Sequence, residues 1–247
     1  MYDIVFISFN ESNANKKYLD LLKHIVKLDN RVHRIHGVTG IHQAHIAAAK
    51  IVSTNMFWVV DADARVLPNF KFNIKLDASE EDIVHVWKSI NPVNNLEYGY
   101  GGIKLLPREL TLYMDLSKPD MTTSISSRFK AMPIVSNMTE FNIDPLSTWR
   151  SAFRECAKLA SRTIEGQLDN ETAHRLKVWT HIGGDQPFGE YAKGGASAGE
   201  WFGKTYKDDT VMLAKINDYA WLESEFNGHI KMFPPKTFKG DWPLEEK

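Results

Sequence analysis

The sequence Met-Phe-Trp-Val-Val-Asp-Ala-Asp at residues 56–63 predicts a buried strand with a polar site at its end. Its five apolar residues run without alternation into two carboxylates, Asp61 and Asp63. A continuous apolar run of this kind is typical of a strand covered on both faces, as in the middle of a parallel sheet. Because ligands of open α/β sheets bind just beyond the carboxyl ends of such strands, we expect the two aspartates to lie at a ligand site.

Two carboxylates in that position can hold a hard divalent cation such as Mg²⁺ or Mn²⁺, which prefers oxygen ligands. The cation can in turn bridge to a diphosphate and neutralise the charge of a leaving group. Aspartate is also common in turns, so the alternative interpretation of Asp61 and Asp63 is a solvated turn between strand and loop.

Length and composition describe an ordinary globular protein. The 247 residues can form one large domain or a domain with a smaller appendage. A net charge of −1 argues against indiscriminate nucleic-acid binding. Residues 1–7 read as a first strand rather than a signal peptide, and the single cysteine, Cys156, fits a reducing compartment. We therefore expect a cytoplasmic protein.

Strand and helix patterns alternate in the first half of the chain, which predicts a doubly wound α/β fold with a mostly parallel sheet. Residues 115–144 lack periodicity and are expected to form a long loop over the site. A helix capped by Asp144 follows, and the last third is predicted to be helical, with a final helix that ends near Gly228. Strands are expected at residues 4–7, 31–36, 56–60, 83–87 and 102–106.

Three motifs carry a resemblance to a known family. They are Ser8-Phe9-Asn10-Glu11 after the first strand, an Ala-rich helix that begins near Gly40-Ile41-His42-Gln43, and Asp61-Ala62-Asp63. In this order they resemble the nucleotide-sugar domain of family 2 type glycosyltransferases, which have the GT-A fold. The resemblance covers roughly the first 110 residues. The Arg-Asn pair that this family often carries on the helix is absent here.

The resemblance implies roles for these residues. Phe9, Asn10 and Glu11 would contact the base and ribose of a nucleotide, and His42 and Gln43 occupy a further nucleotide-binding position. Asp63 would bind Mn²⁺ or Mg²⁺ directly, while Asp61 would face the ribose or a metal-bound water. The Asn10-Glu11 pair can equally be a simple turn before a helix.

The family resemblance also implies that the two parts of the chain bind different substrates. Residues 1–112 would form the α/β part that binds the nucleotide sugar, and residues 113–247 the mainly helical acceptor side of the same domain. Several GT-A families recruit a C-terminal histidine as a further metal ligand, and His229 is the candidate here. A lone histidine after a helix more often has no such role.

Acceptor contacts are expected in the middle of the chain, at Trp87, Tyr100, Gly101 and Gly102. Glycines let a ligand approach the backbone, and aromatic rings can stack on a sugar or base. Trp87 and Tyr100 can equally be core or hairpin residues.

The catalytic base is predicted from the segment Gly183-Gly184-Asp185, which is expected to open a helix. It resembles the acidic motif that many GT-A enzymes place near the acceptor, where the carboxylate acts as general base in inverting transfer. Asp185 is also a natural helix cap. Asp144 and Glu155 are reserve candidates for the base.

Together these features predict a metal-dependent, inverting glycosyltransferase with a nucleotide-diphospho-sugar donor, a UDP-sugar being the first choice. More loosely, the chain resembles bacteriophage glycosyltransferases that modify DNA bases, which suggests hydroxymethylated cytosine as acceptor and the host cytoplasm as location. A glycan or small molecule is the second choice. The basic residues Arg150, Arg154, Lys158 and Arg162, together with Arg128 and Lys130, would then face DNA, unless they form a solvated surface. The alternatives are a nucleotidyltransferase and a non-catalytic nucleotide- or DNA-binding module.

Overall fold

The computed structural model describes residues 1–234 except residues 12, 27, 119 and 165, and it leaves out the side chain of Tyr100. The chain divides into two compact units, Met1–Glu140 and Phe141–Lys247, called unit 1 and unit 2 below. No described helix combines the length and the apolar character needed to cross a membrane.

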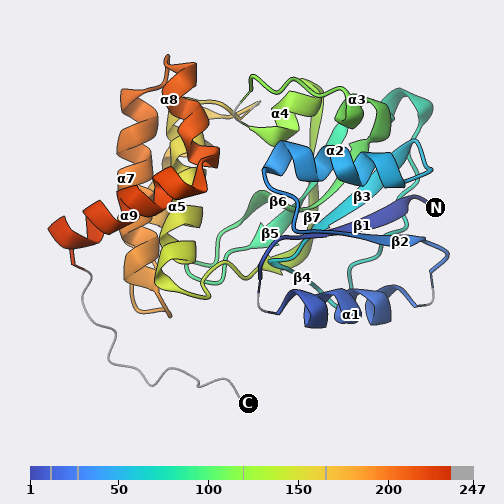
Figure 1. The fold of residues 1–247 in the computed structure, drawn as a ribbon, viewed down its shortest axis with the longest axis horizontal. Coiled ribbons are helices and arrows are strands. Elements are labelled where there is room, and N and C mark those ends of the chain that lie inside the picture. Colours follow the sequence, from blue (N-terminus) through green and yellow to red (C-terminus); the bar gives the residue numbers. More distant parts are fainter. Residues whose placement is uncertain (12, 27, 119, 165, 235–247) are drawn as a thin grey trace. The chain divides into compact units, whose positions relative to one another are not determined.

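Unit 1 is built on a seven-stranded sheet with helices on both faces (Figure 1). The α/β fold expected from the sequence is therefore confirmed. Its elements in chain order are β1 (Asp3–Ser8), α1 (Ala14–Ile25), β2 (Val32–His36), α2 (Ile41–Ile51), β3 (Met56–Asp61), β4 (Ala64–Val66), η1 (Ala78–Glu80), β5 (Val84–Ile90), β6 (Glu97–Pro107), α3 (Arg108–Leu112), α4 (Met121–Ile125) and β7 (Phe129–Thr139).

The strand order is β2-β1-β3-β6-β5-β7-β4. Strand β1 pairs in parallel with both β2 and β3, and β5 pairs in parallel with β7. Strand β6 is antiparallel to its neighbours β3 and β5, and β4 is antiparallel to β7. The central strand β3 is the apolar run of residues 56–60, and all five side chains are fully buried.

The sheet has a hydrophobic core on each face, because the side chains of a strand alternate between faces. Ile4 and Phe6 of β1 join the core under α1, and Val5 joins the core under α2 and α4. An aromatic group fills the α1 side, where Trp58 packs against Trp87 at 4.5 Å between ring centroids.

The expectation of a long loop over residues 115–144 is wrong. That segment contains the short helix α4 and the eleven-residue strand β7, which joins the sheet beside β5. Unit 1 therefore includes β7 and extends to Glu140.

Unit 2 is helical throughout its described part. The helix predicted after Asp144 is present, and Asp144 accepts the backbone N–H of Ser147 as its cap. The elements are α5 (Pro145–Ser161), α6 (Asp169–His181), α7 (Gly189–Thr205), α8 (Thr210–Ala214), η2 (Lys215–Asn217) and α9 (Tyr219–Met232).

Two predicted helix boundaries in unit 2 are wrong. Helix α7 begins at Gly189 instead of at Asp185, because residues 183–188 first form a turn. Helix α9 continues through Gly228 to Met232. Gly228 keeps an ordinary helical backbone there, so the expected left-handed stop does not occur.

Candidate functional site

Three parallel strands of unit 1 deliver the predicted donor residues to one edge of the sheet. Ser8 at the end of β1 lies opposite His36 at the end of β2, and Ile7 lies opposite Asp61 at the end of β3. The backbone N–H of Ala62 donates to Ile7 O at 2.9 Å, which extends the pairing past the strand. The turn at residues 9–11 and the two aspartates therefore leave the sheet side by side.

Asp61 is held by a buried lysine from the neighbouring antiparallel strand. Lys104 Nζ donates to Asp61 Oδ2 at 2.8 Å and to Gly101 O at 2.6 Å. The Lys104 side chain is 3% exposed. Because a buried charge requires a partner, this ion pair fixes the Asp61 carboxylate at the sheet edge.

Asp63 has a different environment from Asp61. Its Oδ1 atom is buried and has no hydrogen-bond partner. Burial, and then the negative charge of Asp61, raise the pKa of the Asp63 carboxyl to about 7. Its backbone carbonyl accepts the N–H of Glu140 at 2.6 Å, which holds the loop in place.

Further charged groups surround this carboxylate pair. The negative charge of Glu11 also raises the pKa of Asp63, while the cations Lys17 and Lys104 lower it, so all of these groups lie within electrostatic range of Asp63. Lys17 pairs with Glu140 at 2.9 Å, and Arg65 pairs with the same carboxylate at 2.6 Å. The site is therefore rich in both carboxylates and cations.

The donor set at Asp61 and Asp63 fits a divalent cation. A buried carboxylate oxygen without a partner is a costly arrangement that an oxygen-seeking cation would relieve. In the part of the chain that the structure describes, no group of three or more His, Cys, Asp or Glu side chains converges on one point. A metal here would therefore take few protein ligands and complete its shell with substrate oxygens and water, as Mg²⁺ commonly does.

The turn after β1 presents two exposed side chains, Phe9 and Asn10. Glu11 Oε2 accepts the backbone N–H of Phe9 at 2.8 Å and closes the turn. Phe9 is 41% exposed, so its ring is accessible to a planar ligand such as a base.

A polar network beside this turn was not foreseen from the sequence. Ser8 Oγ lies 2.9 Å from His36 Nδ1 and accepts Arg34 Nε at 3.3 Å. Arg34 also donates to Asn15 Oδ1 at 2.7 Å, and its guanidinium lies over the ring of Tyr18. The sequence signal for it was the presence of three polar residues in the short strand β2, Val-His-Arg-Ile-His.

His42 and Gln43 lie in the first turn of α2. Gln43 is exposed, whereas His42 is half-buried, with Nε2 3.1 Å from Ser124 Oγ of α4. Burial lowers the pKa of His42, which favours the neutral ring. Their nucleotide-binding role stays a prediction.

The predicted acceptor residues have different environments in the sheet. Trp87 is 3% exposed and packs against Trp58, Phe70 and His85, so its contacts support the core interpretation over an acceptor role. Gly101 has a positive φ of 87°, and a Cβ added there would have no neighbour within 4 Å. A Cβ at Gly102 would lie 2.8 Å from Asn137 Nδ2, so this glycine serves close strand packing. Tyr100 lies on β6, and its side chain is outside the described part.

Asp144, Asp185 and His229 belong to unit 2. Both carboxylate oxygens of Asp144 accept hydrogen bonds from Ser147, one from its backbone N–H and one from its hydroxyl, each at 2.7 Å. Asp185 is exposed, and Gln186 Nε2 donates to it at 3.3 Å. His229 is half-buried beside Trp149. Their roles as base and metal ligand stay predictions.

Glu155 is not suited to the role of general base. Arg175 Nη2 donates to Glu155 Oε1 at 2.6 Å, and the Glu155 side chain is only 4% exposed. The pair is part of the core of unit 2.

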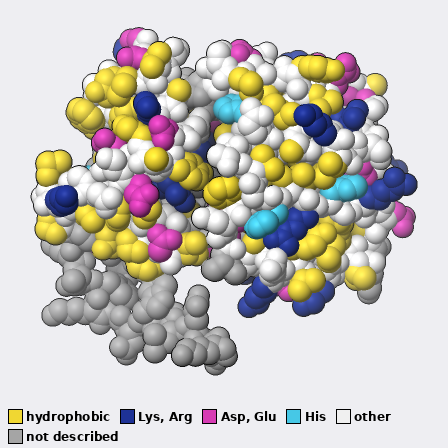
Figure 2. Space-filling model, in the orientation of Figure 1, with side chains coloured by type: hydrophobic (Ala, Val, Ile, Leu, Met, Phe, Trp, Pro, Cys, Tyr) yellow, Lys and Arg dark blue, Asp and Glu magenta, His cyan; other side chains and the backbone are white. Residues whose placement is uncertain are grey.

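The basic residues of α5 make contacts inside unit 2. Arg154 donates to Ile216 O at 2.7 Å and to Asn217 Oδ1 at 2.9 Å, and Arg150 lies over the ring of Tyr219. Lys158 pairs with Glu155 at 3.7 Å, and Arg162 with Asp169 at 2.6 Å. These contacts favour a structural role over a DNA-binding face. Figure 2 shows cations and anions interspersed on both units, in keeping with the net charge of −1.

No protein-family model matches the chain, and no curated protein matches it in sequence. Among solved structures, a glycosyltransferase involved in the glycosylation of the major capsid of PBCV-1 resembles 53% of this chain over 82% of its own length, with 15% identity and a TM-score of 0.35. HddC from Yersinia pseudotuberculosis resembles 53% of this chain over 90% of its own length, with 13% identity and a TM-score of 0.32.

The sheet of unit 1, flanked by helices on both faces, agrees with the GT-A-like fold that the sequence resemblance implies. Because one fold hosts many activities, we base the function on the residues at the sheet edge.

Proposed function

We propose that the protein is a metal-dependent glycosyltransferase that moves a sugar from a nucleotide-diphospho-sugar donor to a hydroxyl acceptor. The observation that carries this proposal is the Asp61 and Asp63 pair at the carboxyl end of β3, with a buried Asp63 oxygen that lacks a partner. A divalent cation on these carboxylates, Mn²⁺ or Mg²⁺, would neutralise the diphosphate leaving group.

The chain's own residues divide the remaining work. Asp63 is the proposed direct ligand, because its free oxygen is buried and Lys104 is committed to Asp61. Asp61 would then orient the ribose or a metal-bound water. Lys104 holds the Asp61 carboxylate in place, so that the site does not have to rearrange when the donor binds.

The nucleotide would lie over the turn at residues 9–11. The exposed Phe9 ring offers a face for the base, and Asn10 offers an amide that can both donate and accept hydrogen bonds. His42 and Gln43 at the start of α2 are the second proposed contact. The sequence resemblance makes a UDP-sugar the first donor to test.

Asp185 is the proposed general base for inverting transfer, because its carboxylate is exposed and makes one long side-chain hydrogen bond. Asp144 is a weaker candidate, because both of its oxygens cap α5. The first acceptor to test is hydroxymethylated cytosine in DNA, as the looser resemblance to bacteriophage enzymes suggests, and the second is a glycan or small molecule.

Donor binding tests the proposal directly. The melting temperature of the full chain is measured with UDP, GDP, ADP, CDP and their sugars, each with and without Mn²⁺. A ligand that binds the folded state raises stability with the logarithm of its concentration over Kd. We expect a shift with one nucleoside diphosphate that requires Mn²⁺, and its loss in Asp63→Ala but not in the control Asp20→Ala on the exposed face of α1.

Full donor binding by Asp63→Ala would overturn the proposal. Release of pyrophosphate in place of a nucleoside diphosphate would instead identify a nucleotidyltransferase. Binding that Mn²⁺ leaves unchanged, with no product formed, would identify a non-catalytic module.

A further inference from the structure

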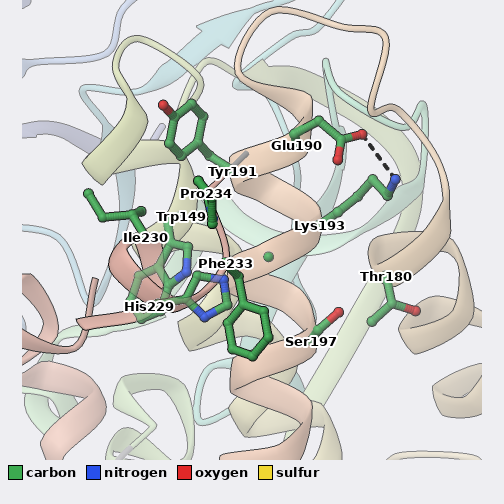
Figure 3. A pocket seen from close by; sticks show the side chains of 11 residues that line it. Trp149, Thr180, Glu190, Tyr191, Lys193, Ser197, His229, Ile230, Phe233 and Pro234 are labelled. Atoms are coloured by element: carbon green, nitrogen blue, oxygen red, sulfur yellow. Dashed lines mark hydrogen bonds and ion pairs between the residues drawn. The ribbon is translucent and has the colours of Figure 1, made fainter. Parts of the chain in front are cut away.

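Unit 2 contains a pocket of about 280 Å³ that none of the predicted roles uses except through His229. Its walls come from α5, α6, α7, α9 and the residues just after α9, and it is open to solvent on one side (Figure 3). Small-molecule pockets usually measure about 300–1000 Å³. The pocket is therefore of a size for a ligand of one ring, and too small for a whole nucleotide sugar.

A buried donor without a partner lies in the pocket wall. Trp149 is 1% exposed, and its indole Nε1 has no hydrogen-bond partner. Figure 3 shows this nitrogen on the side of the ring that faces His229 and the pocket interior. Because a buried N–H without an acceptor is costly, the site is suited to a ligand that brings an acceptor oxygen or nitrogen.

The charged groups of the pocket compensate each other. Glu190 Oε1 and Lys193 Nζ of α7 form an ion pair at 3.0 Å, drawn as a dashed line in Figure 3. Burial lowers the pKa of His229, which favours its neutral ring. The polar groups of the lining carry no net charge, so the pocket favours a neutral ligand over a phosphate or a carboxylate.

Glycine positions show that the pocket is closely built. A Cβ at Gly194 would lie 2.8 Å from His229 Nε2, so only a glycine lets the imidazole reach this depth. A Cβ at Gly184 would collide with the carboxylate of Glu190. The turn at residues 183–188 therefore sets the position of the Glu190 carboxylate. The sequence had instead pointed to Asp185 as the functional carboxylate of this segment.

An exposed aromatic ring lies at the rim. Phe233 is 65% exposed, and its ring centroid is 5.3 Å from that of His229. Ser197 of α7 adds a hydroxyl group to the lining (Figure 3), whereas the Thr180 hydroxyl donates to Leu176 O at 2.8 Å. An apolar face opposite hydroxyl and carboxylate groups matches the two kinds of surface of a sugar, its C–H face and its hydroxyls.

We propose that this pocket binds a neutral monosaccharide unit. The C–H face of the sugar packs on Phe233, its hydroxyls bond to Glu190, Lys193 and Ser197, and one of its oxygens accepts the Trp149 N–H. The site lies entirely within unit 2 and goes beyond the donor site proposed for unit 1.

Calorimetric titration of the full chain tests the site, without Mn²⁺ or nucleotide so that donor binding does not contribute. The probes are methyl α-D-glucopyranoside, methyl β-D-galactopyranoside and methyl α-L-arabinofuranoside, with cytidine and inorganic phosphate as competitors. We expect saturable millimolar binding of at least one glycoside. Glu190→Gln should weaken it about tenfold, or ~1.4 kcal/mol.

Ser197→Trp should abolish binding, because it fills the pocket from an exposed helical position. Ser224→Trp places the same bulk on the exposed face of α9 and should leave binding unchanged. The proposal is overturned if no glycoside binds the wild type, if Ser197→Trp binds as well as wild type, or if cytidine or phosphate alone occupies the pocket. Because the donor is absent, these results do not depend on the function proposed for unit 1.

Discussion

Gly199 of α7 packs directly on the carbonyl group of Phe153 in α5, so closely that a Cβ on Gly199 would lie 2.8 Å from Phe153 Cα and collide with its oxygen. The contact repeats one turn earlier and one turn later, where Gly195 meets Trp149 and Gly203 meets Ala157. The two helices therefore run in the same direction, in contact through a stripe of glycines. Three backbone contacts of this kind leave no room for a side chain.

Gly199→Ala should destabilise unit 2 strongly, because the helices must separate to admit the methyl group. Overpacking of this kind typically costs about 1–3 kcal/mol or more. Gly228→Ala is the matched control, since nothing lies within 4 Å of a Cβ there. It replaces glycine by alanine inside the exposed part of α9 and should stabilise by up to about 1 kcal/mol. Urea unfolding of both variants measures the difference, and equal stability would refute the close contact.

Glu155→Gln should also destabilise unit 2, because it removes the main counter-charge of the buried Arg175. Arg175 also pairs with Glu171 at 3.9 Å, on the exposed side. Removing one partner of a buried pair typically costs about 3–5 kcal/mol. Lys204→Ala is the control, since it breaks the exposed pair with Glu200 and should cost less than ~1 kcal/mol. A loss of similar size in both variants would contradict the difference in burial.

The centre of unit 1 could be predicted from the sequence because local pattern and tertiary environment agree there. The run of residues 56–60 reads as a doubly covered strand, and it lies between β1 and β6 with all five side chains buried. The proximity of Glu11 to Asp63 also follows from the order of the strands in the sheet. The strands β1 and β3 are parallel neighbours, so the residues that follow them leave the sheet at the same edge.

Strand β7 could not be predicted in this way. It contains Pro133, several of its side chains are exposed, and its register against β5 shifts around Lys88. Its residues therefore follow no regular alternation, and its place in the sheet depends on pairing with distant strands.

The same limit explains what was missed at the candidate sites. Lys104 is the one charged residue in the apolar run 103–106, which marks it as unusual, but its pairing with Asp61 depends on the antiparallel placement of β6. Glu190 lies in the first turn of a helix that begins four residues later than expected. The sequence therefore pointed to Asp185 as the acidic residue at the helix start. Helix ends are the part of a structure that sequence patterns locate least well.

His45 should make unit 1 sensitive to acid. Burial, and then the nearby charge of Lys104, lower its pKa from 6.5 to about 3. Its Nδ1 atom lies 2.8 Å from Ile41 O, and its buried Nε2 has no partner. Between pH 6.5 and 3 the unfolded chain binds a proton that the folded chain does not, so stability falls as pH falls, by up to about 1.4 kcal/mol per pH unit.

Urea unfolding at pH 7.5, 6.0 and 5.0 measures this effect. In His45→Gln the acid-induced loss should be smaller, because glutamine does not titrate. His181→Gln is the control, since His181 is exposed at the end of α6. If His45→Gln lost stability with acid as steeply as the wild type, the titration of His45 would not be the cause.

Lys104→Met should destabilise unit 1 and make it more dependent on divalent cations. The ammonium pairs with Asp61 at 2.8 Å and its charge also acts on Asp63, so without it the two neighbouring carboxylates lose part of their charge compensation. The expected cost is about 3 kcal/mol or more, as for other broken buried pairs. Methionine keeps the length of the side chain, so the packing of β6 changes little.

Mn²⁺ should recover much of that loss, because a cation at Asp61 and Asp63 replaces the missing positive charge. The rise in melting temperature on adding Mn²⁺ at pH 8, above the pKa of about 7 of Asp63, should therefore be larger in Lys104→Met than in the wild type. Lys130→Met removes a surface lysine that pairs with Glu80, and should respond to Mn²⁺ like the wild type. Equal Mn²⁺ responses in all three proteins would show that the cation does not bind where Lys104 compensates the aspartates.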